Sequence, residues 1–423
     1  MTNLKDSLPR RSAPWIAAAT LAALSAATTS CSPSTLGQSA LDLTMTSAYR
    51  APPTRLGLAA LSSSASPAAP PRYQLLAGDL HCHVSPPDSP QDVSRGVAET
   101  VALARSERLD FVVLTPHVGA RFFTDDAARA QVLVGREELG AALAREDTRG
   151  TVFVLGMEYT DHRYGHVGAS FADLAQVLGD VPTSDAAAHP ERFFQAFAAR
   201  GGLLVVNHPL VTPLDSIVPI ARANLSWRPF TARGPFPAEI LAVNRMAQAF
   251  EVYNLPATHL RDRILLGDTD LSLRTTLERL DHEIVAQRRP MTPVGGSDSH
   301  THHVRATTFV LARGRTEADV LEALLAGRTC VRGPEACSFE ARAPGGGWVT
   351  VGGAVHGDSV EVRADGDDID VILDGVSVQR PEGGVAARVT LDPKKCAVLR
   401  AHVGEGYSAP IYANCAFAPA AVE

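Results

Sequence analysis

This chain has no excess of positive charge. Its 423 residues carry a net charge of −7 and give a sequence pI of about 6.1, so there is no electrostatic reason to expect nucleic acid or anionic lipid as a surface partner. Cysteine is scarce as well, since six cysteines are too few for a disulfide scaffold at this length. Histidine, by contrast, occurs 14 times. The length predicts two or three domains.

A hydrophobic run of transmembrane length is also missing. The longest apolar stretch, residues 12–27, is short for a membrane span and follows a basic segment, which is the pattern of an export signal. It leads into Thr28-Thr29-Ser30-Cys31, which resembles a bacterial lipobox except at Thr28, where an aliphatic residue is usual. We therefore expect residues 1–31 to be a signal peptide with a lipobox. The mature protein would be exported to the periplasm or cell envelope and anchored by a lipid at Cys31; an ordinary cleaved signal and an uncleaved leader are the alternatives.

The part of the chain after the leader divides by composition. Residues 32–72 are rich in Ser, Ala, Pro and Thr without a periodic apolar pattern, which predicts a disordered linker. From residue 73 onward, continuous apolar runs alternate with helix-like segments, as in a β/α barrel or a doubly wound sheet. We expect strands at 111–114, 152–155, 203–206 and 249–254. We expect one helix to begin at Ser89 and further helices at 124–147, 192–200, 269–288 and 316–327. A long loop is expected at 210–248.

The last 87 residues, 337–423, have a different pattern of Gly, Val and short alternating runs. This pattern predicts a small C-terminal all-β domain, sandwich-like and appended to the α/β part. Four cysteines lie in or next to this region, namely Cys330, Cys337, Cys396 and Cys415. In an exported protein they could form disulfides, and four buried thiols are an equally good interpretation.

Residues able to bind metal follow the expected strands. His81 and His83 are one residue apart, so on a strand they share a face while Cys82 points away. Carboxyl ends of strands carry the chemistry in barrels and doubly wound sheets. The candidate ligands are His81, His83, Asp88, His117, Glu158, His166, His208, Asp298 and His300.

Nine candidate ligands are too many for one ion. Imidazoles and carboxylates without thiolates suit Zn²⁺, Mn²⁺ or Fe²⁺, so we expect two or three divalent ions, with a carboxylate such as Glu158 able to bridge a pair. Two adjacent metals lower the pKa of a shared water, hold it as hydroxide, and stabilise the attacking and leaving oxygens of a displaced group. The sequence therefore predicts a metal-dependent hydrolase.

The ligand motifs and their order resemble those of the PHP (polymerase and histidinol phosphatase) superfamily, over roughly residues 73–333. The matching segments are Asp79-Leu80-His81-Cys82-His83 with Asp88, Thr115-Pro116-His117, Gly156-Met157-Glu158, Gly165-His166, Asn207-His208-Pro209 and Ser297-Asp298-Ser299-His300. Two departures are Pro116, where the family has aspartate, and Val84, where it has Ser or Thr. The resemblance implies a distorted seven-stranded β/α barrel, here at 73–336, with a di- or trinuclear centre that hydrolyses phosphate or carboxylic ester-like bonds.

Two further segments, residues 326–334 and Ala409-Pro410-Ile411-Tyr412, resemble the carbaryl-hydrolase-like branch of this superfamily. The first functional hypothesis is accordingly an exported phosphoesterase acting on a small-molecule ester. The alternative is a carbamate or carboxylic ester hydrolase, and a second alternative is a non-catalytic metal- or envelope-binding surface protein.

Several residues near the ligands are candidates for roles other than coordination. The catalytic set is Asp88, His166, His303 and Arg305, in which an outer histidine would protonate a leaving group and an arginine would hold an anionic substrate group. Other candidates are His302 as a residue facing the site or supporting a ligand, His162 as a competitor of His166, Arg121 and Arg163 as anion binders, and Asn254 as a pocket residue or strand cap.

Overall fold

The computed structural model describes residues 73–161, 165–209, 227–231, 236–257, 267, 270–301 and 303–417. The predicted leader 1–31, the linker 32–72, the anchor residue Cys31 and most of the predicted loop 210–248 lie outside these residues. No helix in the part that is described combines the length and apolar character needed to cross a membrane.

The α/β part contains strands and helices in alternation, as expected. Its strands are β1 (Gln74–Cys82), β2 (Phe111–Leu114), β3 (His117–Gly119), β4 (Val152–Leu155), β5 (Met157–Asp161), β6 (Gly165–Ser170), β7 (Leu203–Val206), β8 (Ala249–Asn254), β9 (Thr292–Gly296), β10 (Thr308–Ala312) and β11 (Thr329–Val331). Its helices are α3 (Val97–Ser106), α4 (Asp126–Leu143), α5 (Leu174–Asp180), α6 (Thr183–Ala188), α7 (Glu191–Ala199), α8 (Arg228–Thr231), α9 (Ala238–Met246), α10 (Leu255–Ala257), α11 (Leu271–Gln287) and α12 (Glu317–Leu325), with 3₁₀ turns η1 (Ala120–Phe123) and η4 (Pro334–Ser338).

Local capping explains where several of these helices start. The Asp125 carboxylate accepts hydrogen bonds from the backbone N–H groups of Ala127 and Ala128 at the start of α4. Thr316 and Asp319 form a capping box at the start of α12. The predicted opening of a helix at Ser89 is wrong, because α3 begins only at Val97. The residues before it form turns, in which the backbone N–H groups of Asp92 and Val93 donate to the Ser89 C=O.

The strands of the α/β part belong to two sheets. One contains β3-β5-β6-β7-β8-β9 in that order, and β1, β2 and β4 belong to a larger sheet. The division falls at Pro116 and Gly156, between β2 and β3 and between β4 and β5, and proline cannot donate a ladder hydrogen bond. The expected seven-stranded barrel is therefore not confirmed as one continuous sheet. The two sheets still meet, since Asp298 N–H donates to His81 C=O at 2.8 Å.

The sheets are mixed rather than parallel throughout. Strand β6 runs antiparallel to both β5 and β7, and β10 runs antiparallel to β1. The remaining neighbours in the six-stranded sheet pair in parallel, and β7, β8 and β9 are buried throughout, with Val, Leu and Phe side chains in the core. The continuous apolar runs of β2 and β7 thus correspond to strands buried on both faces, as expected.

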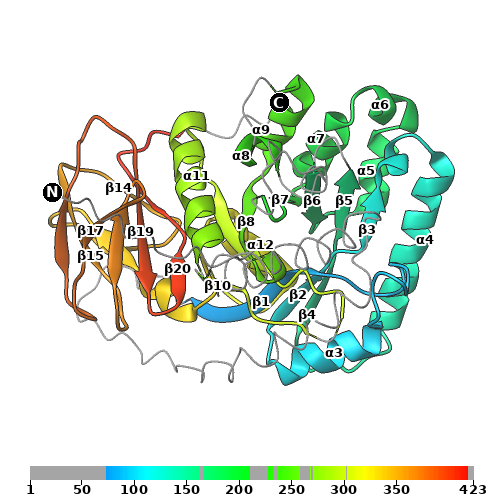
Figure 1. Ribbon diagram of the computed structural model, residues 1–423, viewed down its shortest axis with the longest axis horizontal. Coiled ribbons are helices and arrows are strands. Elements are labelled where there is room, and N and C mark those ends of the chain that lie inside the picture. Colours follow the sequence, from blue (N-terminus) through cyan, green and yellow to red (C-terminus); the bar gives the residue numbers. More distant parts are fainter. Residues whose placement is uncertain are drawn as a thin grey trace, which may run out of the picture.

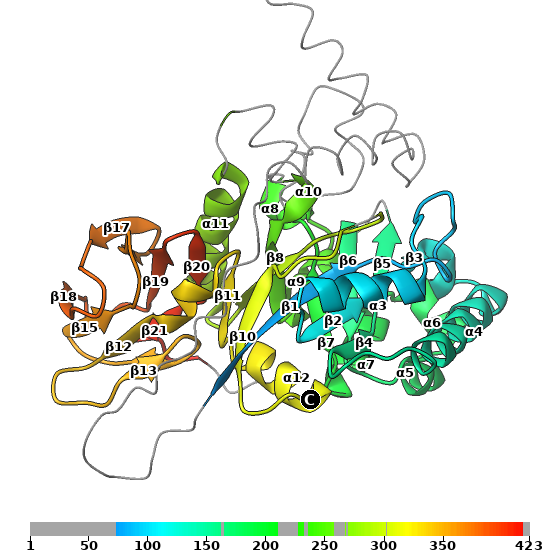
Figure 2. The same cartoon turned by 90° about the horizontal axis from the view of Figure 1, so that it is seen from below.

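The C-terminal residues form strands β12 (Glu340–Arg342), β13 (Val349–Thr350), β14 (Ala354–Val355), β15 (Ser359–Arg363), β16 (Asp370–Leu373), β17 (Val376–Gln379), β18 (Ala387–Thr390), β19 (Ala397–Val403), β20 (Gly406–Ser408) and β21 (Ile411–Ala413). We call β12–β21 the strand lobe, which lies at one end of the molecule in Figures 1 and 2. Its β13-β12-β15-β18 sheet is separate, but β20 pairs with β11, so the other strands extend the large sheet of the α/β part. The domain boundary at residue 337 stays a prediction.

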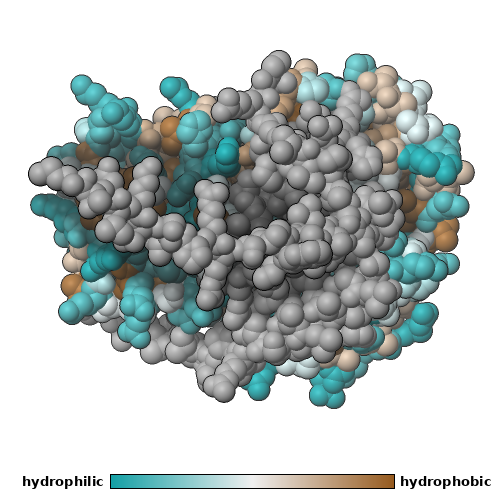
Figure 3. Space-filling model, viewed as in Figure 1, coloured by the Kyte–Doolittle hydropathy of each residue, from teal (hydrophilic) through white to brown (hydrophobic). Residues whose placement is uncertain are grey.

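The strand lobe and the α/β part also share a buried ion pair. Arg400 of β19 donates from Nε to the Asp281 Oδ1 atom of α11 at 2.5 Å, and both side chains are buried. Figure 2 shows α11 beside the strand lobe. On the face seen in Figure 3, hydrophilic side chains predominate along the outer edges of both parts. The strand lobe is therefore packed against α11 through a buried charged contact.

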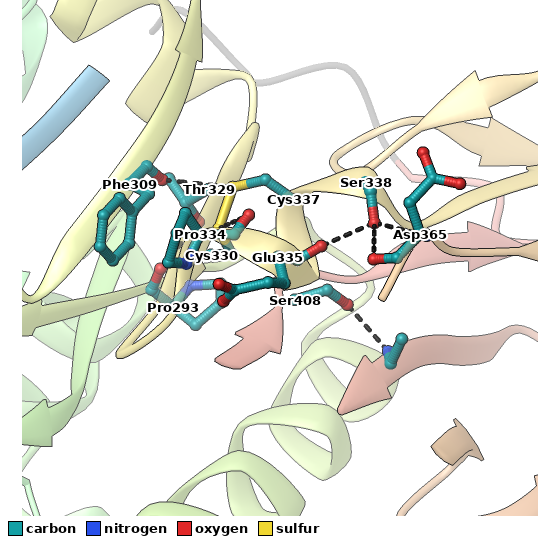
Figure 4. The surroundings of a disulfide bond; sticks show 11 residues. Pro293, Phe309, Thr329, Cys330, Pro334, Glu335, Cys337, Ser338, Asp365 and Ser408 are labelled. Carbon is teal, nitrogen blue, oxygen red and sulfur yellow. Dashed lines mark hydrogen bonds between the residues drawn. A yellow bond between two sulfur atoms is a disulfide. The ribbon is translucent and has the colours of Figure 1, made fainter. Parts of the chain in front are cut away.

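The four cysteines of this region form two disulfides, Cys330–Cys337 and Cys396–Cys415. Figure 4 shows the first, between β11 and η4. Of the two alternatives that the sequence left open, the structure has the paired one. Cys82 is the free cysteine among the described residues, and it is buried.

We expect removal of the Cys396–Cys415 disulfide in the double variant C396S/C415S to lower the free energy of unfolding by about 3 kcal/mol. The bond closes a sequence separation of 19 residues and restricts the unfolded chain accordingly. The C330S/C337S variant should lose less, because its separation is 7 residues. Urea denaturation followed by circular dichroism would measure both. Equal midpoints for wild type and C396S/C415S would contradict the prediction.

Candidate metal centre

The nine predicted ligands lie together at the carboxyl ends of the strands. His81 is the next-to-last residue of β1 and His83 directly follows this strand, His117 begins β3, and Glu158 and His166 lie on the paired strands β5 and β6. His208 follows β7, and Asp298 and His300 follow β9. Asp88 reaches the cluster from the segment between β1 and α3.

One set of ligand atoms gathers around the Glu158 Oε1 atom, and we call it the His81 group: His81, Glu158 and His208. The His81 Nε2 and His208 Nε2 atoms lie 3.2 and 3.3 Å from Glu158 Oε1. His166 Nδ1 and Asn207 Nδ2 approach the same oxygen at 3.1 and 2.9 Å. All three members of the group are buried and offer ligand atoms within 4.8 Å of one another.

A second set consists of His83, His117 and His300, and we call it the His83 group. Its ligand atoms also lie within 4.8 Å of one another. The His83 ring stacks between the other two, with ring centroids 4.1 Å from both. The buried Nε2 atom of His300 has no hydrogen-bond partner among the described residues. A buried imidazole nitrogen in such surroundings suits a bound cation.

Two carboxylates lie between the groups. Glu158 presents Oε1 to the His81 group, and its Oε2 lies 3.5 Å from His117 Nε2 and 3.7 Å from His83 Nε2. Asp298 Oδ1 is 3.4 Å from His81 Nε2 and 3.3 Å from His83 Nε2. Both carboxylates are thus placed where a bridge between two cations would be.

The histidine tautomers indicate that cations fit this space. Ionised carboxylates accept only, so His81 Nδ1–H donates to Glu251 and His83 Nδ1–H donates to Asp88, at 3.1 and 3.2 Å. In the neutral form of each ring, the Nε2 atom then carries a lone pair. The two Nε2 atoms nevertheless face each other at 3.1 Å. Two lone pairs at this separation repel unless a cation or a proton lies beside them.

Proton affinities in the cluster agree with this conclusion. Burial lowers the pKa of His83, but hydrogen bonds to Asp298 and Asp88 outweigh burial and raise the pKa to about 9. For Glu158, burial raises the pKa, yet the charges of His166 and His81 hold the pKa well below its ordinary value. Burial, together with the charge of His83, lowers the pKa of His300 to about 3. The cluster therefore attracts positive charge at some nitrogens and offers neutral nitrogen at others.

Asp88 lies behind the imidazoles. Its Oδ2 accepts from His83 Nδ1, and its Oδ1 accepts from His117 Nδ1 at 3.1 Å and from the His117 backbone N–H at 2.7 Å. Contacts of this kind fix the orientation and tautomer of histidine ligands. Coordination by Asp88 remains a prediction, whereas its contact with two candidate ligands is observed.

The other candidate residues lie in different surroundings. His303 is buried and its carbonyl oxygen accepts from Arg95, while Arg305 Nη1 lies 4.0 Å from Glu107 after α3. Arg121 is largely exposed and pairs with Asp125. Asn254 donates to Asp298 Oδ2 at 3.2 Å, so it borders the cluster. His162, Arg163 and His302 lie outside the described residues.

Two buried residues of the site were missed in the sequence. Glu251 contacts His81 from β8, where an apolar run concealed it. The Arg95 guanidinium donates to the carbonyl oxygens of His83 and Thr301 and to Ser299 Oγ, so it ties the end of β1 to the segment after β9. Arg95 looks like an ordinary surface residue in the sequence because partners such as Ser299 and Thr301 lie more than 200 residues further along the chain.

Comparisons with known proteins gave structural likenesses alone. No protein-family profile and no curated protein matches the chain. Among solved structures, a two-domain protein containing a predicted PHP-like metal-dependent phosphoesterase from Bacteroides vulgatus is 18% identical, with a TM-score of 0.38, over 80% of this chain and 96% of that one. A lesion-specific endonuclease from Pyrococcus furiosus is 13% identical, with a TM-score of 0.33, over 63% and 61%. PsfC from Pseudomonas syringae is 18% identical, with a TM-score of 0.35, over 59% and 88%.

Proposed function

We propose that this chain is a metal-dependent hydrolase of the PHP superfamily that holds two divalent cations. The observation that carries the proposal is the presence of two ligand groups with no side chain in common, the His81 group and the His83 group, joined by the carboxylates of Glu158 and Asp298. Each group offers three ligands without using a side chain of the other. A third grouping, of His81, His83 and Asp298, overlaps both of them. Imidazole and carboxylate ligands suit Zn²⁺, Mn²⁺ or Fe²⁺, and a third ion is not needed to explain the cluster.

Bound in these groups, the cations would supply Lewis acidity and a nucleophile formed from water at neutral pH. The chain itself contributes orientation. Asp88 holds the protons on the Nδ1 atoms of His83 and His117, so that both Nε2 atoms remain available. Glu158 and Asp298 bring negative charge between the groups. We keep coordination by Asp88 as the alternative to this orienting role.

Proton transfer to a leaving group is assigned to His166, whose Nδ1 atom lies 3.1 Å from Glu158 Oε1. Burial lowers the pKa of His166, so the neutral ring predominates at neutral pH and the protonated ring would be a strong acid toward the leaving group. His303 and Arg305 stay candidates for contacts with substrate, although Arg305 faces Glu107 in this structure.

A phosphoesterase acting on a small-molecule ester is the first substrate class, on the strength of the six motifs in superfamily order. A carbamate or carboxylic ester hydrolase is the alternative, because residues 326–334 and 409–412 resemble the carbaryl-hydrolase-like branch. Fold does not choose between the two. Export and a lipid anchor at Cys31 are proposed from the leader, and the two disulfides favour an oxidising compartment.

The test combines metal content with three reporter substrates. Protein lacking residues 1–31 would be analysed for bound metal and assayed with p-nitrophenyl phosphate, bis-p-nitrophenyl phosphate and p-nitrophenyl acetate, with His81→Ala as the control. We expect about two equivalents of metal and a turnover that His81→Ala abolishes. The preferred reporter separates phosphate from carbonyl chemistry. Less than one equivalent and no turnover after reconstitution with Zn²⁺, Mn²⁺ or Fe²⁺ would favour the non-catalytic surface protein.

A further inference from the structure

Glu251 is a buried carboxylate of β8 that lies behind the candidate ligands rather than among them. Its side chain is about 1% exposed, and its Oε1 atom lies 3.1 Å from His81 Nδ1. Residue 251 is 170 positions from His81 in the sequence. A carboxylate so deeply buried is costly unless its oxygens are matched by donors, so its contacts indicate what it is there to hold.

The contact with His81 determines which ring nitrogen of His81 carries the proton. The carboxylate can only accept, so the proton of a neutral His81 is held at Nδ1 and Nε2 is left with its lone pair. This Nε2 atom faces Glu158 Oε1 at 3.2 Å and Asp298 Oδ1 at 3.4 Å. Glu251 therefore selects the tautomer in which His81 can act as a ligand.

The second oxygen of Glu251 holds another member of the same group. Its Oε2 atom accepts from the His208 backbone N–H at 2.6 Å. His208 has φ +26°, a backbone conformation that residues other than glycine rarely adopt, so a fixed acceptor helps to maintain it. The same Oε2 accepts from Asn254 Nδ2 at 3.3 Å, and Asn254 also donates to Asp298 at 3.2 Å.

The space around this carboxylate is closed on the side of β9. A Cβ atom at Gly296 would lie 2.2 Å from Glu251 Oε1 and 2.3 Å from His81 Cβ. Only glycine fits between β9 and the Glu251–His81 contact without moving one of them. The contact between Glu251 and His81 therefore depends on glycine at position 296.

We propose that Glu251 is the positioning residue of one half of the metal centre, fixing His81 and His208 for the cation of the His81 group. Asp88 has the corresponding place behind His83 and His117 in the His83 group. The centre is thereby built from two halves, each with its own supporting carboxylate. This inference rests on the proposed two-cation hydrolase and adds which residue controls which cation.

The test uses Glu251→Gln and Asp88→Asn, which keep side-chain size while removing the charge. Binding of Zn²⁺ would be followed by competition with a chromophoric chelator, and the number of equivalents by elemental analysis. We expect E251Q to weaken one of two sites by about 10- to 100-fold and to leave the other unchanged. D88N should weaken the other site, that of the His83 group, and the double variant E251Q/D88N should weaken both.

Combination with ligand variants identifies the affected half. E251Q should change nothing further in the His81→Ala background, where the site it supports is already lost. In the His117→Ala background it should weaken the remaining site. Asp281→Asn serves as the matched control, since Asp281 is a buried carboxylate paired with Arg400 instead of with a candidate ligand; it should lower stability and retain both sites.

Unchanged affinity of both sites in E251Q would overturn the role of Glu251, and so would an equal loss at both sites accompanied by loss of structure. These outcomes differ from failure of the proposed function. If wild-type protein takes up no metal, the two-cation centre itself is wrong. If wild type and E251Q both bind two equivalents with equal affinity, only the role of Glu251 is removed.

Discussion

If the proposed hydrolase function holds, replacement of Glu158 by glutamine is expected to lower kcat/KM by about 10³-fold for the preferred reporter substrate. Glu158 is the residue that both ligand groups share, with Oε1 near His81, His166 and His208, and Oε2 near His83 and His117. Glutamine keeps the shape but removes the charge between the cations. Loss of about 4 kcal/mol of transition-state stabilisation corresponds to this factor.

The same substitution should reduce metal content, because an amide is a poor bridge between two cations. A matched control is Glu340→Gln, which removes the charge of an ion pair with Arg363 in the strand lobe and should leave both activity and metal content unchanged. Steady-state kinetics and elemental analysis of the two variants would measure the effects. Full activity of E158Q with two equivalents of metal would contradict a bridging role for this carboxylate.

The membership of the cluster could be predicted from the sequence because it depends on local rules. His81 and His83 share a face because strand side chains alternate, and residues following adjacent strands meet at one edge of a sheet. The structure brings the nine predicted residues together at that edge. The helices expected at 269–288 and 316–327 are confirmed at Leu271–Gln287 and Glu317–Leu325 for a similar reason, since periodicity and caps are local.

Features that depend on distant partners could not be predicted. Glu251 is embedded in an apolar strand, and its partner His81 lies 170 residues away. Arg95 interrupts the expected helix from Ser89 because its guanidinium binds carbonyl groups more than 200 residues further along, such as that of Thr301. The division into two sheets follows from backbone pairing around Pro116, which a residue pattern does not specify.

Removal of the metal ions by a chelator is expected to lower the free energy of unfolding by about 8 kcal/mol. Each ion stabilises the native state by about 4 kcal/mol when its free concentration is 1,000 times its dissociation constant, and two ions add. The apoprotein also keeps the carboxylates of Glu158, Asp298 and Asp88 around His83, within 3.7 Å of its ring nitrogens. Urea denaturation with and without chelator would measure the difference, and equal midpoints would contradict the two-cation centre.

The difference in free energy of unfolding between metal-loaded and metal-free protein should depend on pH because of His83, whose pKa in the folded apoprotein is raised to about 9. The ordinary histidine pKa of about 6.5 describes the unfolded chain. A pKa raised by folding stabilises the apoprotein fully below about pH 6.5, and this contribution is lost as the pH rises through about 9. The apoprotein should therefore become less stable as the pH rises between these values.

The affinity for metal should rise with pH, whereas the stability of the apoprotein should fall. A cation at the His83 group must displace the proton of His83, whereas the pKa of His300, lowered to about 3, leaves that ring without a proton to displace at neutral pH. At a fixed free metal concentration, affinity should rise about tenfold per pH unit for each displaced proton, or about 1.4 kcal/mol. The difference in stability between loaded and metal-free protein should accordingly widen from pH 6 to pH 8. A difference that narrows over this range would show that metal binding takes up protons instead of releasing them, and would contradict displacement of the His83 proton.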